Sequence, residues 1–261
     1  MLSHNQLKYF SSLRNKKFRE EYGRFLAEGE KVVSDLLEYS QCILKAETIL
    51  CLPEFLEKHD PEKLKPGIEV IPVSEKELSR ISSFSTPNQA ILICRKPDYS
   101  PDFGAILNEL SVFLDDISDP GNLGTIIRTA DWFGIRNIFC THGSVELYNP
   151  KVIQSSMGSV CRVRVHYINA DELQKVFKKN GYKIFGMVLN GENIYTQALP
   201  SKGMIILGNE SKGISADIQE LIGVRLTIPP VAEGREKTDS LNIAAAAAVI
   251  FSEFRRQNYS K

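Results

Sequence analysis

The chain has 261 residues, of which 43% are hydrophobic and 25% are charged. This length fits one large domain or two modest ones, and the composition is ordinary for a globular protein that buries a real core. The 32 Lys and Arg balance the 32 Asp and Glu, which excludes the global basicity that often marks a nucleic-acid binder. Any contact with RNA would therefore need a local basic patch.

Membrane, metal and disulfide chemistry have no support in the sequence. No apolar run approaches the roughly 20 residues that span a bilayer, and MLSHNQLKYF lacks the apolar core of a secretory signal. The five cysteines are scattered without a CxxC pair, and the four histidines are equally dispersed. We therefore expect reduced thiols, no metal, no membrane partner and a cytoplasmic address.

Residues 1 to about 40 are predicted to be helical. Their opening turns interleave basic with aromatic side chains: Lys8, Arg14, Lys16, Lys17, Arg19 and Arg24 with Tyr9, Phe10, Phe18, Tyr22 and Phe25. This mixture suits phosphate contact with base stacking, and it suits equally well the solvated face of an amphipathic helix above core aromatics. The helical pattern continues through FLAEGEKVVSDLLEY, with Val32, Val33, Leu36 and Leu37 facing inward.

From Ile43 to Arg95 the pattern alternates between strands and helices, which predicts a small α/β domain. We expect strands at Thr48–Leu52, Ile68–Pro72 and Ala90–Arg95, a helical turn at Pro53–Lys58, and a helix EKELSRI that Ser74 caps. The proline-containing, aperiodic segment Arg95–Phe103 is the best linker. The predicted division is a first domain at 1–97, a linker at 98–104 and a second domain at 105–261.

The second part begins with the strand, turn and helix of VFLDDISDPGNLGTIIRTADWFG, residues 112–134, where Gly134 suits a left-handed helix cap. Further apolar runs predict strands at Asn137–Thr141, Val163–Tyr167, Lys183–Leu189, Gly203–Gly208 and Val224–Ile228. Helical stretches at Ala170–Asn180 and Ala216–Ile222 lie between them, and a helix over Ser240–Gln257 closes the chain. This alternation predicts a mostly parallel sheet with helices on both faces.

Three glycine-containing segments carry the polar side chains of a candidate site. They are DPGNLGTIIR (the first motif, residues 119–128), LGNESKGIS (the second motif, 207–215) and IPPVAEGREKTDSLN (the third motif, 228–242). The second motif has the glycine spacing of a phosphate-binding loop, but Ile214 stands at the lysine position, which disfavours a nucleotide hydrolase. The chain contains neither GxGxxG nor GxSxG, so an ordinary dehydrogenase or hydrolase has no support.

Together these segments resemble, in order, the three motifs of the SpoU (TrmH-type) RNA methyltransferases of the SPOUT superfamily. The resemblance covers most of residues 112–250. RFLAEGEKVVSDLL and FSTPNQAILICR in the first 95 residues also resemble the substrate-binding domain that precedes the catalytic domain in many ribosomal-RNA members.

The resemblance implies an S-adenosylmethionine-dependent 2′-O-ribose methyltransferase of structured RNA, more plausibly ribosomal than transfer RNA. It also implies an obligate homodimer and a C-terminal trefoil knot, although the rarity of knots predicts against one. The family's methyl-donor positions fall on Leu189, Gly208, Asn209, Ile228 and Leu241. Its polar active-site positions fall on Asn122, Arg128, Glu210, Ser240 and Asn242. The alternative is a non-catalytic RNA-binding protein that keeps the fold.

Four of the five polar candidates also have a purely structural interpretation. Arg128 could act as the proton acceptor, as a clamp on the phosphate beside the target ribose, or as a surface ion pair with Asp131. Asn122 could form an Asx turn, Glu210 could hold backbone amides, and Ser240 could cap the last helix. The segment IPPVAEGREKTD is longer and more charged than the family pattern, which puts the local geometry of the third motif in question.

Overall fold

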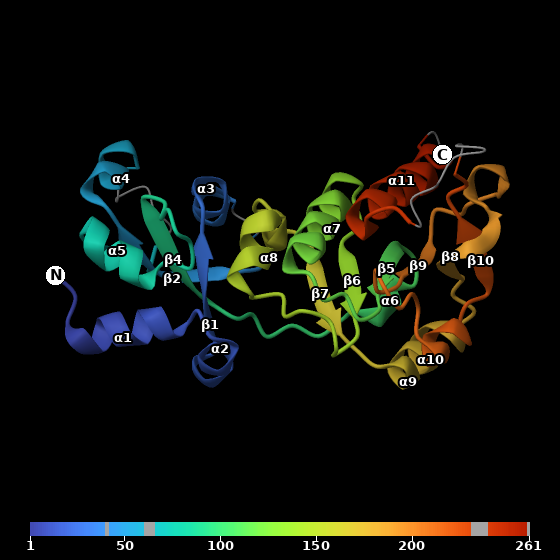
Figure 1. Ribbon diagram of the computed structural model, residues 1–261, viewed down its shortest axis with the longest axis horizontal. Coiled ribbons are helices and arrows are strands. Elements are labelled where there is room, and N and C mark those ends of the chain that lie inside the picture. The colour runs from blue at the N-terminus through green and yellow to red at the C-terminus, as the bar shows by residue number, and fades with distance from the viewer. Residues whose placement is uncertain (40–41, 60–65, 231–239, 260–261) are drawn as a thin grey trace. The chain divides into compact units, whose positions relative to one another are not determined.

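The computed structural model describes residues 1–39, 42–59, 66–230 and 240–259 (Figure 1). The chain packs as two compact units. The first combines Met1–Tyr99 with Glu146–Arg162, and the second combines Ser100–Val145 with Val163–Lys261. The segment Glu146–Arg162 thus belongs to the first unit, although in the sequence it follows Ser100–Val145 of the second unit. The domain boundaries drawn from the sequence, with their roles, stay a prediction.

The first unit is a four-stranded sheet covered by helices. Its elements are α1 (His4–Ser12), α2 (Lys16–Tyr22), β1 (Arg24–Glu28), α3 (Glu30–Glu38), β2 (Lys45–Cys51), α4 (Pro53–Lys58), β3 (Glu69–Pro72), α5 (Glu75–Ile81), β4 (Ala90–Arg95) and α8 (Pro150–Ser155). The strands lie in the order β1-β4-β2-β3, with β2 and β3 parallel and the other neighbours antiparallel. Apolar side chains of α1 and α5, such as Phe10 and Ile81, share one core cluster with Leu26, Leu50 and Ile93 of the strands.

One prediction for this unit was wrong, because Arg24–Glu28 is a strand and not part of a helix. Gly23 ends α2 in the left-handed conformation (φ 61°), and Gly29 (φ 108°) separates the strand from α3. Four consecutive residues, from Phe25 to Glu28, are buried, and the strand pairs with β4 along its whole length. Burial on both sides of a strand removes the alternation that would have revealed it.

The remaining strands and helices predicted for this unit are present, although β2 begins three residues earlier than predicted, at Lys45, and ends at Cys51, and β3 begins at Glu69. The helix α4 and the strand β4 have the predicted bounds. Ser74 caps α5 in a capping box, in which the Glu77 amide donates to Ser74 Oγ (3.3 Å) and the Ser74 amide donates to Glu77 Oε2 (2.9 Å). The predicted inward residues of α3 are all buried: Val32, Val33, Leu36 and Leu37.

The second unit is a parallel sheet with helices on both faces, as predicted (Figure 1). Its elements are α6 (Phe103–Ile106), β5 (Leu110–Leu114), α7 (Pro120–Trp132), β6 (Asn137–Cys140), β7 (Arg164–Tyr167), α9 (Ala170–Leu173), a π-helix (Gln174–Lys178), β8 (Ile184–Asn193), β9 (Gly203–Leu207), α10 (Ala216–Gln219), β10 (Val224–Thr227) and α11 (Ile243–Arg256). The strand order is β10-β8-β9-β5-β6-β7, and every neighbouring pair is parallel.

Two long helices of this unit, α7 and α11, pack against each other. The helix α7 starts at Pro120 with Asp119 as its N-cap, and Gly134 just beyond it has φ 65°, as predicted from the sequence. Arg255 of α11 donates through Nε to the carbonyl of Phe133 (2.7 Å) and through Nη2 to that of Gly134 (3.0 Å). These bonds satisfy carbonyl groups at the end of α7 and fix α11 beside it.

Three further observations bear on the expectations from composition. Within the described residues, no helix is long and apolar enough to cross a membrane, and no three His, Cys, Asp or Glu side chains gather as metal ligands do. All five cysteines are free thiols. Burial raises the pKa of the Cys51 thiol to about 11, so this thiol stays protonated at neutral pH.

An ion pair ties the returning segment to the rest of the first unit. Arg19, only 3% exposed, places its Nη2 2.6 Å from Glu146 Oε2, and Lys96 Nζ lies 3.0 Å from Oε1 of the same carboxylate. Burial by itself raises the pKa of Glu146, but the hydrogen bonds from Arg19 and Lys96 outweigh it, so that the pKa is lowered. The carboxylate is therefore charged in the folded protein and stabilises the fold in that form.

We expect Arg19→Met to destabilise the protein by about 1–3 kcal/mol, because the partly buried Glu146 loses the hydrogen bonds from Arg19 and keeps only Lys96. Urea unfolding measures the change. The control Lys16→Met, which removes an exposed pair with Glu20 (3.7 Å), should change stability by less than about 0.5 kcal/mol. The difference between Arg19→Met and the natural protein should shrink as the pH falls below the usual titration range of a glutamate, because Glu146 has a lowered pKa and its protonation removes the pair. A loss no larger than that of the control would contradict the role of the pair.

Candidate active site

The candidate site lies where two central strands of the parallel sheet end. The strands β5 and β9 are neighbours and end in register at Leu114 and Leu207, so the segments that follow them leave the same edge of the sheet. The Asp115 amide continues the ladder by donating to the Leu207 carbonyl (2.9 Å), and the Ser215 amide donates to Asp115 Oδ2 (2.7 Å). The Asp115 side chain thus joins the turn after β5 to the end of the second motif.

The second motif forms a tight loop that its own Asn209 holds together. The Asn209 and Gly213 backbones exchange two hydrogen bonds (3.0 and 2.9 Å). Asn209 Oδ1 accepts from the amides of Ser211 (2.9 Å) and Lys212 (3.0 Å), and its Nδ2 donates to the Asp116 carbonyl (2.7 Å). The Asn209 side chain is therefore engaged with the protein, and the place of Asn209 beside the methyl donor stays a prediction.

Asp116, in the turn after β5, contacts this loop and has a strained backbone conformation. Asp116 has φ 56°, a left-handed conformation that residues other than glycine rarely adopt. Its amide donates to Thr141 Oγ1 (2.8 Å), and its Oδ2 lies 3.3 Å from Lys212 Nζ. Sequence reasoning did not assign Asp115 or Asp116 to the site. The signal that could have found them is the pair of carboxylates directly after a buried strand.

One hydrogen-bonded chain of side chains joins all three motifs. Asn242 Nδ2 donates to Asn122 Oδ1 (3.0 Å), and Asn122 Nδ2 donates to Glu210 Oε1 (2.6 Å). Both ends of the Asn122 amide are thus engaged, and Asn122 and Asn242 meet although 120 positions separate them in the chain. The structure brings together three of the five residues predicted for the polar active site.

These contacts also decide between the structural interpretations of the three residues. Asn122 is inside α7 and forms no Asx turn, since the N-cap is Asp119, whose Oδ1 accepts from the Asn122 amide (2.7 Å). Within the described residues, the Glu210 side chain bonds to Asn122 and holds no backbone amide. Asn242 is the N-cap of α11, where its Oδ1 accepts from the Ala244 amide (2.9 Å), so the prediction that this helix starts at Ser240 was wrong. Ser240 precedes the cap and is exposed.

Arg128 stands apart from this chain of side chains. It lies on α7 six residues beyond Asn122, about 9 Å further along the helix axis, and its side chain is exposed. Across the part of the chain that the structure describes, its guanidinium makes no ion pair, so the alternative of a surface pair with Asp131 is not formed. An exposed cation of this kind is available to a ligand.

The three apolar residues predicted to line the methyl donor are wholly or partly exposed to water. Leu189 is 75% exposed and Leu241 is 51% exposed, whereas Ile228, directly after β10, is partly buried. Leu189 belongs to a bulge in β8, whose register against β10 jumps from Gly186 to Glu192. Residues 231–239, which include most of the longer segment of the third motif, lie outside the described residues.

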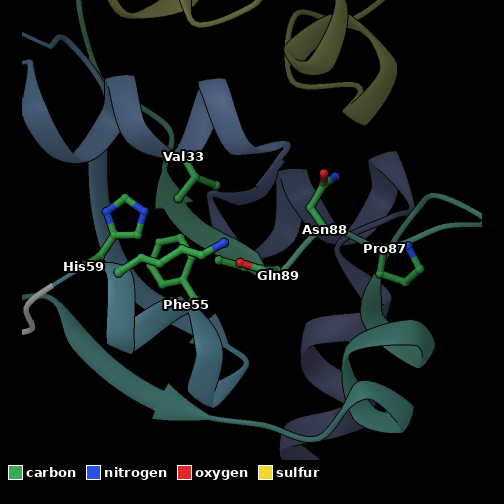
Figure 2. Close-up of a pocket in the computed structure, with 8 residues that line it drawn as sticks. Val33, Phe55, His59, Pro87, Asn88 and Gln89 are labelled. Atoms are coloured by element: carbon green, nitrogen blue, oxygen red, sulfur yellow. The ribbon is translucent and has the colours of Figure 1, made fainter.

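A separate pocket of about 270 Å³ lies within the first unit, and Figure 2 shows its lining side chains. Val33 of α3 and Phe55 of α4 contribute to it, together with residues that precede β4. The rings of Phe55 and His59 stack with their centroids 4.2 Å apart. This pocket contains none of the predicted site residues.

Comparison with known proteins identifies the family. Residues 109–252 match the SpoU rRNA Methylase family, and residues 4–92 match the MRM3-like substrate binding domain. The chain belongs to the SpoU rRNA methylase family. The recognition made from the three motifs is therefore confirmed.

Individual known proteins resemble the chain over nearly its whole length. It is 29% identical to the 23S rRNA (guanosine(2553)-2′-O)-methyltransferase RlmP of Bacillus subtilis, over 96% of each chain. A putative RNA methyltransferase of the TrmH family from Porphyromonas gingivalis has 34% identity and a TM-score of 0.86, covering 98% of this chain and 99% of that one. The AdoMet-bound rRNA methyltransferase from Sinorhizobium meliloti has 29% identity and a TM-score of 0.83, covering 98% and 96%.

We expect Gly208→Ala to disrupt the loop of the second motif. A Cβ at Gly208 would lie 2.3 Å from the carbonyl carbon of Gly213 and 2.4 Å from the Ile214 nitrogen, which are backbone atoms that cannot rotate away. Overpacking of this kind costs about 1–3 kcal/mol, which thermal unfolding measures. The control is Gly223→Ala, whose Cβ would meet only the Ile184 carbonyl oxygen at 3.6 Å. Equal unfolding temperatures for the two variants would contradict the close approach.

Proposed function

We propose that the chain methylates the 2′-hydroxyl of a ribose in ribosomal RNA, with S-adenosylmethionine as the methyl donor. The observation that carries this proposal is the hydrogen-bonded chain Asn242–Asn122–Glu210, which unites the three motifs at one edge of the parallel sheet. Ligands of open α/β sheets bind at the carboxyl ends of the strands. The relatives support the chemistry, since RlmP is named as a 2′-O-methyltransferase of 23S rRNA and the Sinorhizobium meliloti protein binds AdoMet.

The residues at this edge fit the methyl donor. The donor combines an adenine ring with a charged amino-acid tail, so it needs apolar cover together with backbone hydrogen-bonding groups. The exposed leucines 189 and 241 with Ile228 would supply the cover, and the backbone of the loop that starts at Gly208 would supply the polar groups. When bound there, the donor supplies an electrophilic methyl group.

Arg128 has the properties of a phosphate clamp. A guanidinium stays protonated in proteins, so it is poorly suited to accept the proton of a ribose hydroxyl, but its fork of N–H donors matches a phosphate. We assign Arg128 to the phosphate beside the target ribose, where it would align the hydroxyl with the methyl group.

Asn122 and Glu210 have different roles in this proposal. Asn122 is a positioning residue, because both ends of its amide are already bonded and it holds Glu210 relative to the start of α11. Glu210 is exposed and uses only Oε1 in this bond. Its Oε2 would accept a hydrogen bond from the ribose hydroxyl and would favour loss of the hydroxyl proton. Ser240, exposed just before α11, completes the polar side of the site.

We expect Arg128→Ala to abolish methyl transfer while the unfolding temperature and the affinity for S-adenosylmethionine stay near those of the natural protein. The physical reason is that the exposed guanidinium contributes no ion pair within the described residues, so its loss affects only bound RNA. Transfer of a radiolabelled methyl group to RNA measures the effect, and calorimetry measures the affinity. The matched control is Arg136→Ala at the opposite end of the sheet, before β6, which should retain full transfer.

A second substitution separates the two chemical roles of Arg128. Arg128→Lys keeps the charge and loses the fork, so a clamp predicts weaker RNA binding with an unchanged pH dependence of the transfer rate. A shifted pH profile would favour the role of proton acceptor. Full methylation by Arg128→Ala would remove Arg128 from the mechanism altogether.

The substrate can be identified by mass spectrometry of RNA from cells with and without the gene. We expect one 2′-O-methylated nucleotide of ribosomal RNA to be missing in cells that lack the gene and to return when the natural gene, but not its Arg128→Ala form, is restored. Oligonucleotide mapping then gives its position. Identical methylation in both cells, with RNA binding intact, would favour the non-catalytic RNA-binding alternative.

We also propose the homodimer, the trefoil knot and the cytoplasmic address that the family resemblance and the composition imply. Trp132 of α7, 85% exposed beside the alanine-rich α11, supports a subunit interface there, and a sedimentation mass near twice 29.3 kDa tests it.

The placement of β9 between β8 and β5 supports the knot, which an experimentally traced backbone tests. The five free thiols support a reducing compartment, which fractionation of cells tests.

A further inference from the structure

A basic groove lies on the first unit, and its lining contains no residue assigned to methyl transfer. It has a volume of about 680 Å³ and is formed by α1, the start of α2 and the end of α5. Its charged and aromatic lining residues are His4, Lys8, Arg14, Arg80 and Phe18, and the remaining ones are serines and a leucine. No acidic side chain lines it in the part of the chain that the structure describes. We call it the α1–α5 groove.

Three other basic residues of the same segment have acidic partners, whereas the cations of this groove make no ion pair among the described residues. Arg19 pairs with Glu146, Arg24 with Glu47 and Lys16 with Glu20. By contrast, the exposed side chains of Lys8 and Arg80 make no ion pair within the described residues. The chain as a whole has no net charge, so this local excess of positive charge arises from how the fold distributes its ion pairs.

Arg14 is fixed in place by the backbone. Its Nε donates to the carbonyl of Ser11 (3.2 Å) at the end of α1, and its Nη1 donates to the carbonyl of Ser82 (3.3 Å) after α5. These bonds orient the guanidinium and leave its Nη2 group for an anion. Because the side chain is already oriented, less conformational entropy is lost when a ligand binds.

The aromatic member of the lining is held by its neighbours. Phe18 is partly buried and stacks on Tyr22 (centroids 6.0 Å apart, planes at 15°), and Tyr22 meets Tyr9 of α1 edge-on at 5.1 Å. Lys17 Nζ lies 5.8 Å from the centroid of the Phe18 ring. An aromatic ring flanked by cations is the combination that binds single-stranded nucleic acid, with phosphates on the cations and a base on the ring.

We propose that the α1–α5 groove binds a single-stranded segment of the substrate RNA, an inference that rests on the proposed function. Lys8, Arg14 and Arg80 contact successive phosphates, and Phe18 contacts an unstacked base. Double-stranded RNA keeps its bases stacked inside the helix and would leave Phe18 without a partner. An acidic peptide would satisfy the cations and would likewise make no use of the ring.

The test measures binding of the full chain to a fluorescent oligouridine of about 12 nucleotides by anisotropy. The double variant Lys8→Glu/Arg80→Glu should raise the Kd at least tenfold, and it should flatten the slope of log Kd against log salt by about 1.4, or about 0.7 for each lost phosphate contact. Phe18→Leu should raise the Kd at least about fivefold with an unchanged salt slope, because it removes stacking and no charge.

The matched control is Lys45→Glu/Lys175→Glu, which makes the same change in net charge at exposed lysines outside the groove. Its Kd should stay within about threefold of that of the natural protein, since screening weakens distant charges. Circular dichroism and the affinity for S-adenosylmethionine should be unchanged in all variants, which separates loss of the groove from loss of the fold.

Three outcomes would overturn the proposal. One is a Kd for the groove variants that equals that of the control, and another is an equal loss with duplex RNA. The third is binding of a polyglutamate peptide that competes with the oligouridine and survives Phe18→Leu. If the natural protein methylates RNA but the groove variants bind RNA as well as it does, the groove proposal is wrong and the proposed function stands. If RNA binds through the groove but no methyl group is transferred, the groove proposal stands and the proposed function is wrong.

Discussion

The candidate site depends on one constraint, the parallel pairing of β5 with β9 at the centre of the sheet. Because the two strands end in register, the turn after one and the loop after the other must leave the sheet side by side. Asp115 then bonds the second motif, and Asn209 bonds the turn in return. The polar residues of the site are thus held by a framework of buried strands, which keeps their positions fixed without a ligand.

On this framework, the Asn122 amide acts as the bridge between the motifs. It engages Glu210 at one end and Asn242 at the other, and Asn242 is at the same time the cap of α11. Helix capping and site formation are therefore served by the same side chains. Arg128 differs from them in having no ionic partner within the described residues, which is the state expected of a group whose partner is the substrate.

The RNA binding proposed for the first unit has to arise in a chain of zero net charge. Ion pairs neutralise Arg19, Arg24 and Lys16, whereas among the described residues the cations of the α1–α5 groove have no acidic partners. The fold thereby concentrates positive charge at one surface while the total stays balanced. A groove of this kind would complement a catalytic site whose own polar groups include a carboxylate.

The sequence by itself determined the elements whose signals are local. Periodicity and caps gave the parallel sheet, the Ser74 cap of α5 and the glycine beyond α7, and the three motifs gave the family. The tertiary structure decided the features that depend on contacts between distant parts of the chain. It made Arg24–Glu28 a strand because both its sides are buried, and it moved the last helix start to Asn242. It also joined side chains 120 positions apart and left Arg128 without an ion pair to any residue that the structure describes, because pairing depends on which strand ends become neighbours and not on spacing along the chain.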